Sequence, residues 1–227
     1  MFSEFKTQYK DKVLIGDTTT SDPSLIKVFF IHGAGKSSIE KFKPLRELML
    51  SKGIHSCGFD FVGHGKTGGE LLGHSLKDRV EQSQTFLSAI GVIPKVLVGT
   101  SMGGYIAVKL LELYPIQTVI MGAPGMFSKE AYDVPFGDEF SKILRKPASW
   151  KESDAWDILA KFKGSLSIYW GEKDEVVSPD IVKMIYDSAV HAEKRKVTVI
   201  PGVGHMLWSY FAEHPEYLEK IAEDSIQ

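Results

Sequence analysis

The chain has 227 residues, of which 43% are hydrophobic and 25% are charged, a composition typical of a globular protein long enough to bury one large core. Its net charge of −2 gives no electrostatic basis for binding nucleic acid or an anionic membrane. The single cysteine, Cys57, excludes an internal disulfide and fits a reducing compartment. We therefore expect one domain, residues 1–227, without a nucleic-acid partner.

The amino-terminal segment, residues 1–16, carries charges in every turn and lacks the basic, apolar and small-residue order of a secretory signal. No apolar stretch of the sequence approaches the ~20 residues that a membrane helix needs. These features predict a cytoplasmic protein without a membrane span. Up to about Ile15, the segment is expected to add one or two antiparallel edge strands to a sheet.

Short apolar runs then alternate with longer amphipathic segments, and continuous apolar runs are typical of parallel strands covered on both faces. Strands are predicted at 27–31, 53–59, 95–100, 117–121, 165–170 and 196–201. Helices are predicted at roughly 40–52, 75–90, 102–114, 178–190 and 208–222. Pro115 is expected to stop the third helix, and Ser178-Pro179 to begin the fourth. The alternation predicts an α/β fold with right-handed crossovers.

The strand at 27–31 leads into a glycine-rich loop, "HGAGKSS", which begins at His32. Its Gly35-Lys36-Ser37 matches only the end of a phosphate-binding P-loop, because Phe30 occupies the position of the first glycine in that motif. The alternative is a loop whose backbone N–H groups receive an oxyanion. The lone cysteine lies in the next predicted strand, where a small buried hydrophobe is the better interpretation than a nucleophile.

The most specific motif is "VGTSMGG", in which Ser101 lies between a predicted strand and a predicted helix. Glycine at 99 and 103 removes the side chains that would collide in so tight a turn. The turn lifts the serine hydroxyl above the sheet, where the N–H of Met102 points toward charge that develops on a substrate. The alternative is an ordinary glycine-rich turn with a helix-capping serine.

From Gly122 to Gly164 about forty residues pass without a convincing strand. Long insertions of this kind are more often functional than idle. We expect a small helical cap, residues 125–163, over a substrate pocket. The residues expected to line that pocket are His32, Met126, Phe127, Phe136 and Trp150.

A serine nucleophile needs a base, and the base needs an orienting carboxylate. Among seven histidines, His205 follows the last predicted strand and would emerge at the same sheet edge as the serine. Asp174 follows the preceding strand and meets the requirement for the carboxylate, with Glu172 and Glu175 as rivals in the same loop. No pair of histidines at i, i+4 and no Cys/His cluster has metal-ligand spacing, so we expect neither a metal nor a cofactor.

The order Ser101, Asp174, His205 resembles that of the α/β-hydrolase family, and the resemblance extends over nearly the full length. "HGAG" resembles the family's oxyanion loop, and "DFVGHGKT" from Asp60 resembles its turn after the fourth strand. The resemblance implies that the backbone N–H of Ala34 is the second oxyanion donor and that the histidine of "HGAG" shapes the loop. It also implies an α/β-hydrolase fold with a mostly parallel sheet and a short cap.

The expected function is therefore a serine hydrolase that cleaves a small or medium acyl or aryl ester through an acyl-enzyme. A thioesterase or a small-amide hydrolase would use the same residues, and a ligand-binding homologue without activity is a further alternative. The sequence does not select among these substrates, and it leaves the oligomeric state open.

Overall fold

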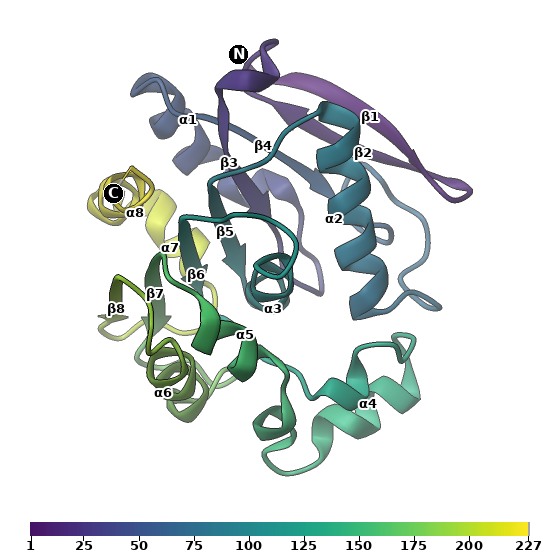
Figure 1. Cartoon of the computed structure of the whole chain (residues 1–227), viewed down its shortest axis with the longest axis vertical. Coiled ribbons are helices and arrows are strands. Elements are labelled where there is room, and N and C mark those ends of the chain that lie inside the picture. The colour runs from purple at the N-terminus through teal and green to yellow at the C-terminus, as the bar shows by residue number, and fades with distance from the viewer. Residues whose placement is uncertain (227) are drawn as a thin grey trace.

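The computed structural model describes residues 1–226. Within them, eight strands form one sheet (Figure 1). The strands are β1 (Ser3–Tyr9), β2 (Lys12–Thr18), β3 (Ile26–Ile31), β4 (His55–Asp60), β5 (Val96–Thr100), β6 (Thr118–Gly122), β7 (Ser165–Gly171) and β8 (Lys194–Ile200). The helices are α1 (Lys43–Ser51), α2 (Leu76–Ile90), α3 (Met102–Leu110), α4 (Asp138–Arg145), α5 (Ala155–Lys161), α6 (Pro179–Ser188), α7 (Leu207–Glu213) and α8 (Pro215–Asp224). Short 3₁₀ segments, η1 to η4, cover Pro23–Leu25, Ile39–Phe42, Lys129–Ala131 and Ser149–Glu152.

The sheet has the strand order β1-β2-β4-β3-β5-β6-β7-β8. Strand β2 pairs antiparallel with β1 and β4, and every other pair is parallel. The predicted α/β fold with antiparallel amino-terminal strands is confirmed. Because the parallel strands all point the same way, the loops that follow β3, β5, β7 and β8 meet at one edge of the sheet.

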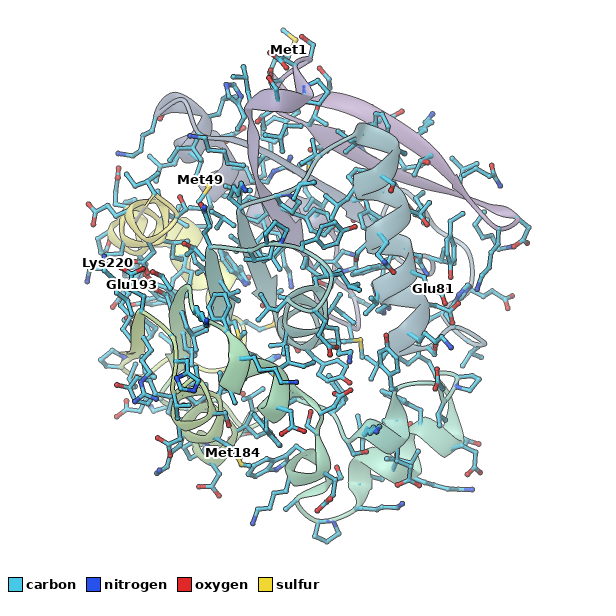
Figure 2. All side chains as sticks on the ribbon, viewed as in Figure 1. Met1, Met49, Glu81, Met184, Glu193 and Lys220 are labelled. Carbon is cyan, nitrogen blue, oxygen red and sulfur yellow. The ribbon has the colours of Figure 1, made fainter. Side chains whose placement is uncertain are left out.

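Helices cover both faces of the sheet and enclose two apolar cores (Figure 1). The core under α2, α3 and α6 includes Phe29, Phe59 and Phe86, whose rings lie 4.7 to 6.3 Å apart. The core under α1, α7 and α8 includes Met49, which lies between α1 and the sheet (Figure 2). This double coverage is the reason that the central strands read as continuous apolar runs.

Two helix boundaries differ from the prediction. Helix α3 ends at Leu110 and continues as turns, so Pro115 does not itself terminate it. The predicted carboxy-terminal helix is two helices, α7 and α8, which meet at His214. Pro215 has no N–H to continue α7 and takes the first position of α8 instead.

Between β6 and β7 the described chain contains short helices and no strand, as predicted. This segment packs against the start of α2, where the N–H of Lys77 donates to the Tyr132 carbonyl and the N–H of Phe136 donates to the His74 carbonyl. Phe136 and Phe140 meet edge to face at 4.9 Å and join the apolar core. A role as a cap over the site remains a prediction.

Candidate active site

Ser101 occupies the turn between β5 and α3 in a strained backbone conformation, with φ of 51° and ψ of −121°. Two glycines permit this turn, since a Cβ on Gly99 would lie 2.5 Å from the carbonyl oxygen of Gly103. A Cβ on Gly103 would lie 2.3 Å from the carbonyl oxygen of Ile31, on the neighbouring strand β3. Conformations with positive φ cost about 1–3 kcal/mol in non-glycine residues and cluster at functional sites.

His205 and Asp174 complete a line of hydrogen bonds that begins at the serine. The His205 Nε2 lies 3.2 Å from the Ser101 Oγ, and its Nδ1 lies 2.9 Å from the Asp174 Oδ2. The second carboxylate oxygen, Oδ1, accepts the N–H groups of Val176 and Val177, each at 2.9 Å. The Asp174 side chain is fully buried, so its orientation is fixed by these bonds and by packing. The structure thus brings together three residues that the sequence places far apart.

The two rivals for the carboxylate position lie elsewhere. Glu172 is exposed, and its carboxylate accepts the N–H of Gly202 at 2.8 Å. Glu175 is also exposed. Of the three acids in this loop, Asp174 is the one within hydrogen-bond distance of His205.

The loop after β3 packs directly on the serine. A Cβ on Gly33 would lie 3.0 Å from the Ser101 Cβ, a tighter contact than most side chains make, so glycine favours this close approach of the loop. The N–H of Ala34 donates to no protein acceptor within residues 1–226. The N–H of Met102 is the first of α3, where no intrahelical acceptor exists. Both predicted oxyanion donors are therefore unpaired in the described chain.

His32 holds this loop in place through hydrogen bonds of both ring nitrogens. Its ring is buried, with Nδ1 2.8 Å from the Gly33 carbonyl oxygen and Nε2 accepting the N–H of Phe61 at 3.0 Å. Burial, followed by the charge of Arg79, holds the pKa of His32 well below its usual range. A neutral ring hydrogen-bonded on both sides suits the loop-shaping role that the sequence predicts.

Asp60 holds the turn after β4. Its carboxylate accepts the N–H of Ile39 at 2.7 Å and the N–H of Lys66 at 2.8 Å. Gly65 lies so close that a Cβ there would be 2.0 Å from the carboxylate. Asp60 therefore stabilises the turn that follows β4, the segment "DFVGHGKT".

A cavity of about 570 Å³ opens at Ser101 and His205. Its walls are the loop at 33–36, the start of the following helix, and the exposed face of α7 with Met206. Volumes of ~300–1,000 Å³ are typical of small-molecule sites. The cavity therefore has the size for a small substrate.

The five residues predicted to line the pocket are absent from the lining of this cavity among the described residues, so this part of the prediction differs from the structure. His32 is buried under the loop, and Met126 and Phe136 are buried in the apolar core. Phe127 packs edge to face on Tyr105 at 5.5 Å, and Trp150 packs on Trp156. The sequence shows that this segment is rich in aromatic residues, but it does not show whether their side chains point into the core or into the cavity.

Arg79 is buried near the candidate site, and the sequence did not predict this placement. Its guanidinium lies 4.5 Å from the centre of the Phe61 ring and 5.2 Å from that of Phe136. Its Nη2 lies 3.4 Å from His64 Nδ1, and burial lowers the pKa of this arginine to about 9. Burial also lowers the pKa of His64 to about 4, so this histidine is neutral at physiological pH. Arg79 reads in the sequence as an ordinary surface residue of an amphipathic helix.

Comparison with known proteins identifies the family. The sequence model of the serine aminopeptidase, S33 family (Hydrolase_4) matches residues 23–153, more than half of the chain. The chain belongs to this family of α/β-hydrolases. This α/β-hydrolase is also 35% identical over 86 residues to a monoglyceride lipase homolog of Monkeypox virus. That match covers 36% of this chain and 31% of the relative, less than a third of its length.

Solved structures share the fold of this α/β-hydrolase over almost the whole chain. An esterase from Exiguobacterium antarcticum superimposes with a TM-score of 0.75 at 16% identity, covering 98% of this chain and 99% of the esterase. The Paleococcus ferrophilus monoacylglycerol lipase superimposes with a TM-score of 0.72 at 19% identity, covering 94% and 98% of the two chains. At these identities the likeness shows the fold alone.

Residues 1–226 of this α/β-hydrolase contain neither a metal-binding cluster nor a membrane-spanning helix. No group of three or more His, Cys, Asp or Glu side chains there is placed to hold a metal ion. None of the described helices is both long and apolar enough to span a bilayer.

We expect Cys57 of this α/β-hydrolase to be inert toward thiol reagents. The side chain is fully buried in β4, and burial raises the pKa of its thiol to about 12. Because the thiolate is the reacting form, the folded protein should show no labelling by iodoacetamide at pH 8 and no loss of activity. The same protein in guanidinium chloride should take up one label per chain. Rapid labelling of the folded protein would contradict the buried placement.

Proposed function

We propose that the protein is a serine hydrolase that cleaves small or medium carboxylic esters through an acyl-enzyme. The observation that carries the proposal is the continuous hydrogen-bonded line from Ser101 Oγ through His205 to Asp174, with distances of 3.2 and 2.9 Å. A serine hydroxyl is a poor nucleophile at neutral pH, and this arrangement is the one that activates it. The esterase and lipase among the structural neighbours agree with this chemistry without selecting a substrate.

In the first half of the reaction, Ser101 Oγ attacks the ester carbonyl carbon while its proton passes to His205 Nε2. Asp174 accepts the Nδ1–H bond and stabilises the imidazolium that forms. The N–H groups of Ala34 and Met102 stabilise the oxyanion of the tetrahedral intermediate, where loss of one donor typically costs about 10²–10³ in turnover. As the intermediate collapses, the imidazolium returns the proton to the leaving alkoxide oxygen, and the acyl group stays on the serine.

In the second half, water takes the place of the alcohol. His205 Nε2 removes a proton from the water as its oxygen attacks the acyl carbon, and the same two N–H groups hold the second oxyanion. Collapse of this intermediate breaks the bond to Ser101 Oγ, which recovers its proton from the imidazolium. The products are one carboxylic acid and one alcohol, and the enzyme returns to its starting state.

Amide cleavage is a second candidate, because the family to which the chain belongs is named after a serine aminopeptidase. An aminopeptidase has to hold the α-ammonium group of its substrate. The cavity carries Lys36 and Lys41 in its walls, and its acid, Glu40, already pairs with Lys43 at 3.2 Å. These charges favour an ester over a substrate with a free amino terminus. Rates on an alanine anilide and on a matched acetate ester would separate the two candidates.

Labelling by a fluorophosphonate tests the proposal directly. This reagent reacts with activated serines, so we expect one label per chain, on the peptide that contains Ser101, and a parallel loss of esterase activity. A preparation unfolded in urea is the control and should remain unlabelled. If the folded protein were not labelled, the hydroxyl would not be activated, and a ligand-binding role without catalysis would be favoured.

A further inference from the structure

Two lysines lie in the wall of the cavity at Ser101. Lys36 is exposed, and Lys41 is half-buried. Neither forms an ion pair with a carboxylate of the described residues. The acid in the same wall, Glu40, is turned toward Lys43. The positive charge is local to the cavity, since the whole chain has a net charge of −2.

The ammonium group of Lys41 is partly removed from water without compensation. Burial lowers its pKa, and no carboxylate acts in the opposite direction. Lys41 lines the cavity together with Ala34 and Ser101, so this cation borders the space in which a substrate would bind. A partly buried cation without a partner is costly unless a ligand supplies the opposite charge.

The rest of the wall suits the hydrocarbon part of a small ester. Ala34, Pro44, Met206, Trp208 and Ala212 contribute apolar surface around the serine and the histidine. A substrate bound here would present its ester to Ser101, its hydrocarbon to these side chains, and any charged end to the lysines. A neutral long-chain ester would leave Lys41 without a partner.

We infer that Lys41, assisted by Lys36, binds an anionic group of the ester substrate, a carboxylate or a phosphate a few atoms from the scissile bond. The inference rests on the proposed ester hydrolysis at Ser101 and adds the substrate's charge to it. Lys41 is thus a specificity-determining residue rather than a catalytic one. Charge-assisted hydrogen bonds to a partly buried ammonium are among the stronger polar contacts in proteins.

Matched pairs of esters test this inference. The first pair is 4-nitrophenyl valerate and the mono-4-nitrophenyl ester of glutaric acid, which have equal acyl lengths and differ by a terminal carboxylate. The second pair is glycerol monobutyrate and the monobutyrate of glycerol phosphate. We expect kcat/KM for the charged member to exceed that for the neutral member by at least about tenfold in one pair, mainly through KM. The pair that shows the preference identifies the source of the anion.

Variants assign the preference to the lysine. Lys41→Met should reduce the ratio of the two kcat/KM values by about tenfold, which corresponds to about 1.4 kcal/mol. Lys36→Met should reduce it less, since this lysine is exposed and screened by salt. Lys52→Met is the matched control, because Lys52 is exposed, pairs with Glu219 at 2.8 Å and does not line the cavity, and its ratio should equal that of the wild type.

Two results would overturn the inference: a wild-type ratio near one in both pairs, or a preference that persists in Lys41→Met. Failure of the proposed function has a different signature, because the wild type would then hydrolyse neither member of either pair. Lys41→Glu gives an independent check. It should reverse the preference, so that the neutral ester becomes the better substrate.

Discussion

Ser101→Ala is expected to lower kcat for an activated aryl ester by about 10⁴–10⁶-fold, the range typical of removing a serine nucleophile. The Oγ is the atom 3.2 Å from His205 Nε2, and no hydroxyl replaces it in the variant. The residual rate should come from binding and from the two N–H groups of the oxyanion site. Burst kinetics with a chromogenic ester should show acyl-enzyme accumulation in the wild type and none in the variant.

A companion variant separates loss of the nucleophile from loss of the fold. Ser101→Gly should be as inactive as the alanine variant, yet more stable by about 1 kcal/mol, because glycine adopts a φ of 51° without strain. Ser178→Ala is the matched serine control, since its hydroxyl makes no capping hydrogen bond at α6. Turnover of the alanine variant within tenfold of the wild type would exclude Ser101 as nucleophile.

Backbone requirements made the centre of the site predictable from sequence. Gly99 and Gly103 flank the serine because no Cβ fits against the facing carbonyl groups, which lie 2.5 and 2.3 Å from where it would be. His205 and Asp174 follow consecutive parallel strands, so sheet topology alone carries both loops to the same edge. These constraints act through the backbone, and they therefore leave a direct pattern in the sequence.

The pocket was not predictable in the same way. Phe136 and Met126 are apolar residues in a long segment, and such residues fill a core as readily as they line a cavity. Lys41 is one charge among several at the start of an amphipathic helix, and only the packed structure shows that it faces the serine's cavity. Side-chain direction in irregular segments depends on tertiary contacts, which sequence periodicity does not encode.

The helix ends also differ in how far local sequence determines them. Pro215 has a local effect, since the missing N–H separates α7 from α8, and this break was readable from the sequence although the prediction joined the two. Pro115, by contrast, lies beyond the turns that follow α3, whose end at Leu110 precedes it. A proline therefore limits how far a helix can extend and does not fix where it ends.

Asp174→Asn is expected to lower kcat by about 10⁴-fold, the loss typical when a triad histidine is held in the wrong tautomer. The Oδ1 position faces the N–H groups of Val176 and Val177, so asparagine must keep its carbonyl oxygen there. Its NH₂ group then faces His205 Nδ1 in place of Oδ2. The ring must accept at Nδ1 and carry its proton on Nε2, which leaves no lone pair for the Ser101 proton.

Glu175→Gln is the matched control, because this neighbouring carboxylate is exposed, and its kcat should stay within about threefold of the wild type. Fluorophosphonate labelling gives a second readout, since an unactivated serine reacts slowly even when the protein is folded. Labelling of Asp174→Asn should therefore slow in proportion to kcat while the thermal midpoint changes far less. Equal labelling rates in Asp174→Asn and the wild type would show that His205 keeps its tautomer without this carboxylate. Asp174 would then stabilise the loop but not orient His205.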